Sequence, residues 1–480
     1  MTLISPIYNL VGLLLMFFSL AFVPSIATAF IYSEGTAQSF FGLFAITLLT
    51  GALLYAISKK DINSLSIHDG FLVTVIFWLI LGLFGSMPFL LIMDLSLVDG
   101  FFESFSGITT TGATVLSGIE NYDKSVLLFR QILQWIGGMG LIILAVAILP
   151  SLGIGGGQLF KMETPGSDNT QKITPRIKET AQALWRIYLA LSVLCFISYM
   201  MAGMSSFDAL AHALSTVSIG GFSTYDKSIG YFNSIPIELV CIVFMLLSSV
   251  SFVLHYSALS SKSLMRYFKN PELGFFLGIM LSIFLVGLIF LVTTKSAEDP
   301  DLRSLIFQTV SIVTTSGFHT EGFAGLPMFL AFLLLIGAFI GACSGSVGGG
   351  IKSWRVMVMV NQVKKEVFKI VHPDAVVTSK IGNKVIDSSI AEKVWGFFSI
   401  YVITFMFLFL AMLATGADFE TSFSTVGACL NNLGPALGEA LYNYENISSV
   451  GKFILILAMV LGRLEIFTFL VVLAPSFWRR

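Results

Sequence analysis

The sequence predicts an all-α polytopic membrane protein. It contains four tandem helix–pore loop–helix repeats in a pseudo-fourfold arrangement around one pore, preceded by two extra transmembrane helices. Hydrophobic residues make up 56% of the 480 residues and charged residues only 11%, unlike a soluble protein. Apolar runs of about twenty residues, long enough to cross a bilayer, recur along the chain. Between them, a short semi-polar segment ending in glycine recurs four times, about every hundred residues.

Membrane-spanning helices are expected wherever an apolar run reaches this length. Two runs precede the repeats, and the others pair around the four semi-polar segments. The predicted helices cover residues 7–30, 37–58, 69–92, 125–149, 182–203, 234–260, 273–294, 326–343, 390–414 and 449–474, and a more polar helix is expected near 353–370.

This pairing divides the chain into five parts. The first part holds the two extra helices, and each of the others holds one repeat. The predicted parts are residues 1–62, residues 63–160, residues 161–268, residues 269–385 with a glycine-rich intramembrane gating loop at 337–352, and residues 386–480.

The distribution of Lys and Arg predicts the orientation, because cytoplasmic connections of membrane proteins are enriched in basic residues. Most of the 27 basic residues face the cytoplasm if the N-terminus is placed there. Both termini are then cytoplasmic, and all four loops enter from the outer face. The outer connections are rich in Asp and Glu, and a negative vestibule raises the local concentration of cations. The net charge of −1 does not suggest a nucleic-acid partner.

The four semi-polar segments align on Gly112, Gly221, Gly317 and Gly434. Glycine permits positive φ and lets backbone carbonyls approach an axis, and the residues before each glycine carry no charge. Neutral oxygens suit a large monovalent cation, whereas divalent ions favour carboxylates. Small-residue clusters also pack membrane helices, but four clusters at matching positions favour a selectivity filter. The predicted ion-binding residues are Thr110, Thr111, Gly112, Ile219, Gly220, Gly221, Thr315, Ser316, Gly317, Asn432, Leu433 and Gly434.

A second glycine-rich stretch, GAFIGACSGSVGGGI at 337–351, interrupts the third repeat. Glycine costs about 1 kcal/mol relative to alanine inside a helix, so we expect a break at membrane depth and a gate under the filter. The alternatives are small-residue helix packing and a nucleotide P-loop. The P-loop pattern is interrupted by Ile351 and follows no strand. The predicted gate residues in this stretch are Gly345, Gly348, Gly349, Gly350 and Lys352.

Two charged residues, Arg463 and Glu465, lie inside the last apolar run, where charges usually face an interior partner or water. We predict that Arg463 holds the gating loop or forms a positive barrier in the pore. The alternative is an ion pair with Glu465 or another acid, although a spacing of two residues is poor helical geometry. Lys452 lies on nearly the same helical face, and we predict that it braces the filter or screens its entrance.

The histidines and cysteines are less informative. We expect the five histidines to be hydrogen-bonded structural residues. His319 follows the third filter glycine and is the histidine to test for pH dependence. The four cysteines are far apart and form no CxxC pair, so neither a disulfide nor a metal site is expected.

On these motifs, the sequence resembles the Trk/Ktr/HKT superfamily of potassium transporters over nearly its whole length. The resemblance rests on TTTGA, SIGGF, TTSGF and NNLGP at the loops, on GACSGSVGGGIKS in the third repeat, and on GRLEIF near the C-terminus. It implies potassium uptake across the cytoplasmic (inner) membrane of a prokaryote. In that superfamily the intramembrane loop obstructs the pore, and a basic residue stands where Arg463 is. A serine at the first filter position goes with sodium transport, so Gly112 favours potassium.

The resemblance also implies partners. It suggests a homodimer of the membrane chain and a cytosolic regulatory ring of Rossmann-type nucleotide-binding subunits. Nucleotide would then bind the partner and not this chain, whose only expected ligand is the transported potassium ion. The basic cytoplasmic segment from Lys352 to Lys393 suits anionic membrane lipid or an acidic protein surface.

The fourth loop departs from the threonine-rich pattern, with Asn431, Asn432 and Pro435, so we expect an asymmetric filter with looser selectivity. Gated, channel-like potassium transport is the favoured function. A proton- or sodium-coupled symporter is the alternative. All four repeats run in the same direction and no chain of carboxylates crosses the predicted helices, which favours channel-like conduction. No constellation of nucleophile, base or metal ligands suggests an enzyme.

Overall fold

A computed structural model describes residues 5–57, 67–148, 177–294, 302–320, 326–375, 377–382 and 384–478. The predicted boundaries between residues 62 and 63 and between 160 and 161 lie outside these ranges. The helices and strands are α1 (Ser5–Ser19), α2 (Phe22–Ile31), α3 (Ala37–Ile57), α4 (Ile67–Leu91), α5 (Leu97–Ile108), α6 (Lys124–Ile148), α8 (Ile177–Met201), α9 (Ser206–Val217), α10 (Ile235–Ser249), α11 (Phe252–Ser260), α12 (Met265–Phe268), α13 (Pro271–Thr294), α14 (Leu302–Val313), α15 (Met328–Ile340), α16 (Ser353–Val371), β1 (Lys380–Ile381), β2 (Lys384–Val385), α17 (Ser388–Ala414), α18 (Phe419–Leu430), α19 (Ser449–Arg463), α20 (Phe467–Leu473) and α21 (Pro475–Trp478).

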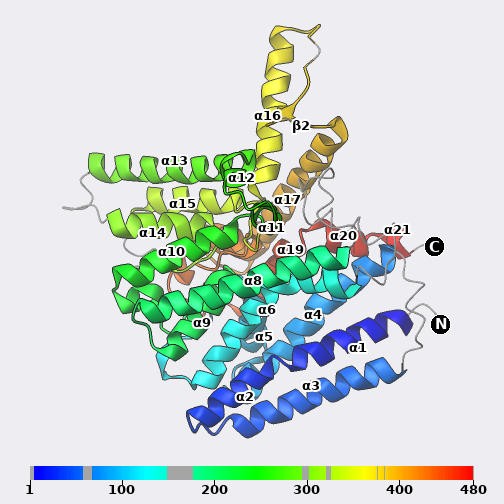
Figure 1. Cartoon of the computed structure of the whole chain (residues 1–480), viewed down its shortest axis with the longest axis vertical. Coiled ribbons are helices and arrows are strands. Elements are labelled where there is room, and N and C mark those ends of the chain that lie inside the picture. Colours follow the sequence, from blue (N-terminus) through cyan, green and yellow to red (C-terminus); the bar gives the residue numbers. More distant parts are fainter. Residues whose placement is uncertain are drawn as a thin grey trace.

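Most of the long helices lie in one bundle, with the N-terminal helices α1 to α3 along one edge and both chain ends at the same side (Figure 1). Helix α16 leaves this bundle and projects from it. The β1–β2 hairpin follows α16, with Lys380 opposite Val385. The sequence analysis did not predict this hairpin, because strands of two residues are too short to show an alternating pattern.

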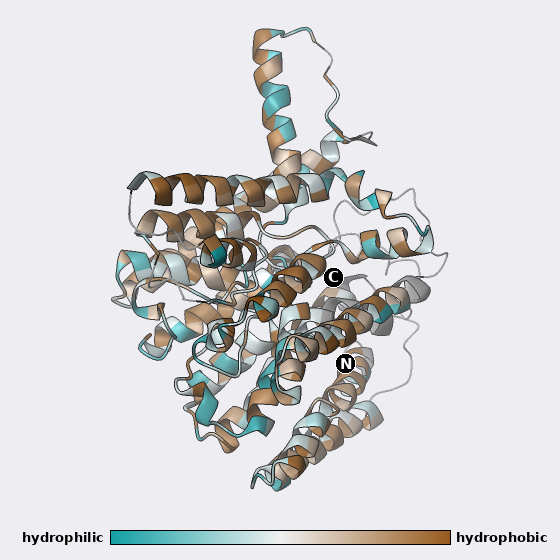
Figure 2. Ribbon diagram, turned by 60° about the vertical axis from the view of Figure 1, so that its left-hand side comes forward, coloured by the Kyte–Doolittle hydropathy of each residue, from teal (hydrophilic) through white to brown (hydrophobic). Residues whose placement is uncertain are grey.

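Length and apolarity make six of the described helices able to cross a membrane, or eight if each of two bent pairs counts as one span. In Figure 2 the long helices are coloured largely brown, which marks hydrophobic residues. On α13, the side chains of Leu277, Leu281 and Leu285 are 44–56% exposed. Contiguous exposed leucines mark contact with an apolar surrounding such as lipid. The prediction of a helical polytopic membrane protein is confirmed.

Two predicted spans were wrong in shape, because each consists of two helices joined at a sharp bend. The run 234–260 bends by 90° between α10 and α11, and the run 449–474 bends by 109° between α19 and α20. At the second bend, Glu465 and Ile466 both have positive φ, which no helix accommodates. Both runs stay apolar through the break, so hydropathy alone could not reveal it.

Each repeat contains a short helix that stops inside the bundle. These four pore helices, α5, α9, α14 and α18, are each 12 residues long. Twelve residues rise about 18 Å, which is too short for the hydrocarbon layer of about 30 Å. Side-chain caps fix three of their starts: Ser96, Ser205 and Asp418 accept hydrogen bonds from the backbone N–H three residues later.

Candidate functional site

The same backbone turn follows every pore helix. Two residues past the helix end, a residue other than glycine adopts left-handed φ: +56° at Thr110, +53° at Ile219, +64° at Thr315 and +51° at Asn432. In the first loop, the N–H of Thr110 donates to Gly107 O at 3.0 Å and that of Thr111 to Ser106 O at 2.9 Å. These paired bonds form a Schellman motif, and they recur in the other three loops. The aligned glycine follows two residues later, with φ between +79° and +92°.

These turns store backbone strain. Left-handed φ costs a residue with a Cβ about 1–2 kcal/mol, and such strain is concentrated at functional sites. Ile219 and the two threonines are β-branched, which makes the conformation rarer still. The positive φ at Thr110 and at Gly112 flanks a residue of ordinary φ. When φ alternates in sign along the backbone in this way, successive carbonyl groups point toward the same side.

The four glycines close a ring. A Cβ built on each one would collide with a backbone carbonyl oxygen of a neighbouring loop: Gly220 for Gly112, Ser316 for Gly221, Leu433 for Gly317 and Thr111 for Gly434. The first loop thus touches the second, the second touches the third, the third touches the fourth, and the fourth touches the first. Only glycine fits this approach at the required φ. All twelve predicted ion-binding residues lie in these loops.

The side chains around the ring differ from loop to loop. Asn432 donates through Nδ2 to Thr111 Oγ1 and to Met459 O, each at 3.0 Å, which joins the fourth loop to the first. The hydroxyl of Ser316 is buried and has no hydrogen-bond partner in the described part of the chain.

Two predicted ion ligands already share their carbonyl with a protein donor. Gln134 Nε2 donates to Gly220 O at 2.6 Å, and Tyr444 Oη donates to Gly434 O at 2.6 Å. The amide of Gln134 also accepts from Ser215 Oγ at 2.7 Å. Glycine at 220 is needed for this contact, because an added Cβ would overlap the Gln134 amide.

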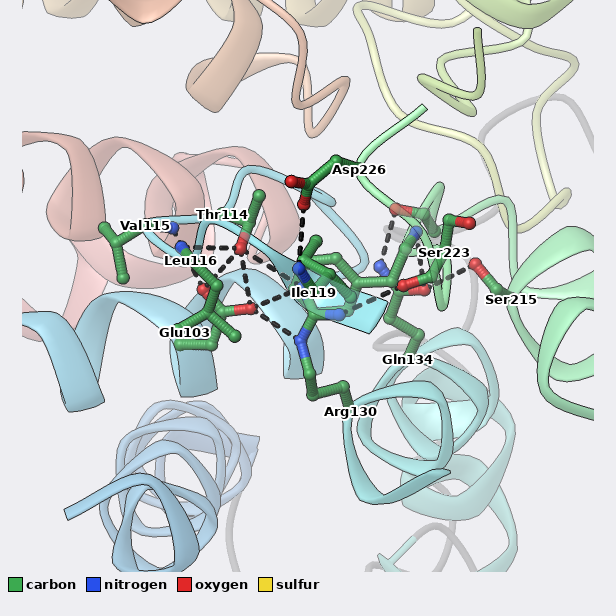
Figure 3. Close-up of polar contacts among 12 residues, drawn as sticks. Glu103, Thr114, Val115, Leu116, Ile119, Arg130, Gln134, Ser215, Ser223 and Asp226 are labelled. Atoms are coloured by element: carbon green, nitrogen blue, oxygen red, sulfur yellow. Dashed lines mark hydrogen bonds and ion pairs between the residues drawn. The ribbon is translucent and has the colours of Figure 1, made fainter. Parts of the chain in front are cut away.

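A buried ion pair stands behind the first loop (Figure 3). Arg130 of α6 and Glu103 of α5 are both fully enclosed, with Arg130 Nη2 at 2.7 Å from Glu103 Oε1. Glu103 accepts hydrogen bonds from Thr114 Oγ1 at 3.0 Å and from Val115 N at 3.1 Å. Arg130 Nη1 donates to Ser223 O at 3.1 Å in the second loop. The pair therefore fixes two neighbouring loops at once.

This pair was not predicted from the sequence. The signal that could have revealed them is Arg130, Gln131 and Gln134 inside an apolar run, since polar groups there face an interior partner. In Figure 3, Asp226 of the second repeat also reaches the first. Its carboxylate accepts from the N–H groups of Gly118 and Ile119 at 2.8 and 3.0 Å.

The segments that follow the four ring glycines line a cavity of about 700 Å³. All four aligned glycines lie on its wall, together with Asp226, Lys227 and His319. Burial lowers the pKa of His319 from its ordinary value. The imidazole therefore stays neutral at neutral pH and gains a positive charge at the mouth only in more acidic solution.

On the inner side of the ring, the chain between α15 and α16 crosses directly beneath the loops. We call residues 341–352 the gate loop. A Cβ on Gly348 would meet Thr314 O at 2.8 Å, and one on Gly349 would overlap Asn431 O. The N–H of Gly349 donates to Thr315 Oγ1 at 2.6 Å. The glycine-rich segment thus lies against two loops of the ring.

The predicted gating loop 337–352 begins four residues too early, because 337–340 complete helix α15. Gly337 packs there, since an added Cβ would meet Ile283 and Val313 side chains at 2.8 Å. Small-residue packing, the alternative in the sequence analysis, is correct for this one glycine. The left-handed turns of the loop proper lie at Gly341, Gly345 and Gly350.

Comparison with known proteins agrees with this geometry. The family model described as TrkH, cation transport protein, matches residues 36–480. The Trk system potassium uptake protein TrkH of Halomonas elongata is 49% identical and that of Escherichia coli K12 is 44% identical, each covering 98–99% of this chain and 99% of the relative. The crystal structure of the potassium transporter TrkH from Vibrio parahaemolyticus matches with a TM-score of 0.90 and 44% identity, covering 99% of this chain and 100% of that one.

The chain belongs to the TrkH family. This is a family of transport proteins and not of enzymes.

In this TrkH-family protein, Arg463 reaches the gate loop. Its Nη1 donates to Val347 O at 3.0 Å and its Nη2 to Gly137 O of α6 at 2.7 Å. Glu465 pairs with Arg355 at the start of α16. The gate loop of this TrkH chain is therefore tied to the first and fourth repeats from below the ring. Lys352, also predicted here, is buried and donates from Nζ to Gly348 O.

Lys452 lies in the first turn of α19. Its Nζ is 2.6 Å from Asp99 Oδ1, in the first turn of pore helix α5, and donates to Glu445 O at 2.9 Å. It is not among the residues that line the outer cavity. This position fits bracing of a pore helix better than screening of the entrance.

Replacing a ring glycine by alanine is expected to abolish ion flux. Gly221→Ala introduces both a left-handed alanine and a collision with Ser316 O, so the second and third loops must separate. Gly203→Ala is the matched control, because Gly203 has φ +100° but open space around it. The control is expected to cost about 1–2 kcal/mol of stability and to keep its flux. Equal flux in the two folded variants would contradict a tight ring.

Breaking the buried pair is expected to destabilise the protein strongly. Arg130→Met leaves the carboxylate of Glu103 enclosed without its partner, which costs about 3–5 kcal/mol. Arg186→Met is the control, because that arginine is exposed and interactions of exposed charges contribute about 1 kcal/mol or less. Thermal unfolding in detergent measures the loss of stability in both variants. A similar loss of stability in the two variants would show that enclosure of the Arg130 pair does not matter.

Proposed function

We propose that the chain takes up potassium across the cytoplasmic membrane through a pseudo-fourfold filter, gated by the loop beneath it. The observation that carries this proposal is the ring of four strained, glycine-ended loops whose backbones touch in a closed cycle, with the gate loop directly underneath. A ring of backbone carbonyls can replace the hydration shell of a cation. The TrkH relatives are named potassium uptake proteins, which supplies the ion.

The oxygens of the ring favour potassium over divalent ions, because they are neutral carbonyls and hydroxyls. Each pore helix points its C-terminal end, which carries partial negative charge, at the ring. The unequal side chains at Thr111, Ser316 and Asn432 give each side of the filter its own polar surface. We therefore expect potassium and rubidium to pass well and sodium to pass less well.

The gate loop is the element that must move for ions to pass. It lies against Thr314 and Asn431 on the inner side of the ring, where it leaves a cavity of only about 90 Å³. Opening requires the loop to leave this position, and its glycines lower the barrier to such a rearrangement. Arg463 opposes the movement, because its two hydrogen bonds tie Val347 to α6.

The proposed partners follow the same reasoning. We propose a homodimer, with projecting α16 as part of its interface, because Val363, Val367 and Ile370 on this helix are 50–79% exposed. Basic residues on the same helix, including Lys364 and Lys365, suit anionic lipid headgroups. A cytosolic nucleotide-binding subunit would act on the gate, and nucleotide would bind that subunit and not this chain. Both termini are proposed to be cytoplasmic.

The function is tested by flux into sealed vesicles that contain the purified protein. We expect rubidium, as a tracer for potassium, to enter down its own gradient without any imposed proton or sodium gradient. Gly112→Ser places a Cβ against Gly220 O and is expected to lose rubidium entry, as Gly221→Ala is. Flux that appears only with an imposed proton or sodium gradient would instead indicate the coupled symporter. Equal entry of sodium and rubidium through the unmodified protein would contradict the filter assignment.

Neutralising Arg463 is expected to raise flux. Arg463→Gln cannot maintain both bonds to Val347 and Gly137, and each lost hydrogen bond weakens the closed position by about 1 kcal/mol. Arg186→Gln on α8 is the matched control, because that arginine is exposed. Rubidium flux per folded molecule, with the amount of folded protein measured by size-exclusion chromatography, distinguishes the two. Unchanged flux in well-folded Arg463→Gln would contradict a gate role.

A further inference from the structure

A short segment between the second and third repeats contacts the gate loop at both of its ends. We call residues 252–272 the strap. It contains α11, α12 and the first turn of α13 and begins at the 90° bend after α10. The sequence analysis read its first half as the continuation of a straight membrane span and assigned it no function.

At the first end of the strap, the backbone freed by the bend bonds to the gate loop. The N–H of Phe252 donates to Gly345 O at 3.0 Å, and the N–H of Cys343 donates to Ser249 O at 3.1 Å, at the end of α10. A break in a helix leaves such groups without intrahelical partners, and inside a membrane they must find others. Here the gate loop supplies them.

At the second end, a carboxylate bonds to the same part of the gate loop. Glu272, in the first turn of α13, accepts from the N–H of Ser344 at 2.5 Å. The three consecutive residues 343–345 are therefore held by the two ends of the strap and the bend before it. Arg463 holds the loop separately, at Val347.

The interior of the strap is closed by a histidine. His255 is 4% exposed, with Nδ1 at 2.8 Å from Tyr267 Oη and Nε2 at 2.8 Å from Leu247 O. These contacts join α11 to α12, through Tyr267, and to the last turn of α10, through Leu247. Arg266 adds a hydrogen bond to Ser257 across the same turn. The strap is thus folded on itself.

The other face of the strap carries large exposed side chains. Leu264, Met265 and Phe268 are 56–86% exposed. The described part of the chain therefore supports the strap mainly from one side. A segment supported from one side can shift without displacing a second layer of the bundle, and such segments are among the less stable parts of a fold.

We propose that the strap sets the position of the gate loop, with His255, Tyr267 and Glu272 as positioning residues that do not touch the ion. The proposal rests on the gate function argued above and adds a second hold on the loop, independent of Arg463. With the strap folded, residues 343–345 stay in place and Gly349 stays under Thr315. When the strap unfolds or shifts, the loop loses its two hydrogen bonds to Phe252 and Glu272, and its closed position weakens.

The test is single-channel recording from the purified protein in planar bilayers. Tyr267→Phe keeps the aromatic side chain at position 267 and removes only the hydroxyl that is hydrogen-bonded to His255. We expect the ratio of open to closed time to rise about fivefold, the change for one ordinary hydrogen bond, with unit conductance and the rubidium-to-sodium ratio unchanged. His255→Ala is expected to have at least this effect. Ser261→Ala is the control, because Ser261 is exposed and bonds only within the strap.

Glu272 provides an independent test by conservative rescue. Glu272→Ala removes the acceptor for Ser344 N–H and is expected to favour the open state, whereas Glu272→Gln keeps a carbonyl oxygen there and is expected to restore the unmodified behaviour. Open-to-closed ratios of Tyr267→Phe and Glu272→Ala equal to that of Ser261→Ala would overturn the proposal. Changed unit conductance or selectivity would also overturn it, because the residues would then act on the ion path. If the proposed gated-filter function itself were wrong, the unmodified protein would conduct no potassium, and this outcome differs from both results that overturn the strap proposal.

Discussion

The arrangement of the four loops depends on the close contact between each ring glycine and a backbone carbonyl of a neighbouring loop. Because the contacts run from the first loop around to the fourth and back, no loop can shift without displacing another. The ring forms only if all four loops arrive at the same depth. Four pore helices of 12 residues, each followed by the same two-bond turn, deliver them there. The strain of four left-handed residues is tolerated because the surrounding contacts leave no alternative.

The groups that support the ring are chemically different in each repeat. The first loop has the enclosed Glu103–Arg130 pair, and the second has His212, whose Nε2 lies 2.9 Å from Ser223 Oγ. In the third, Ser311 Oγ donates to Phe318 O at 2.6 Å. In the fourth, Tyr444 bonds the glycine carbonyl itself. A single chain can vary each side in this way, whereas four identical subunits could not, so the proposed filter would have four unequal sides.

The parts predicted from sequence were those encoded by local patterns. The glycine register located all four loops, apolar run lengths located the helices, and the helix at 353–370 was found as α16. The bends near residues 250 and 465 were missed because hydropathy is continuous through them, and they depend on partners far away in sequence. The Arg130–Glu103 pair was missed for the same reason, since the two residues are 27 positions apart and on different helices. Local patterns specify elements, whereas buried polar partners depend on how the elements meet.

Thr315 shows how closely the ring and the gate loop depend on each other. Its backbone adopts the strained turn of the third loop, and its hydroxyl accepts a hydrogen bond from Gly349 N at 2.6 Å. The gate loop therefore cannot withdraw without leaving that glycine N–H without its partner, at a cost of about 1–3 kcal/mol unless water replaces the hydroxyl. The bond thus favours two distinct positions of the loop over a continuous range, which is the behaviour required of a gate.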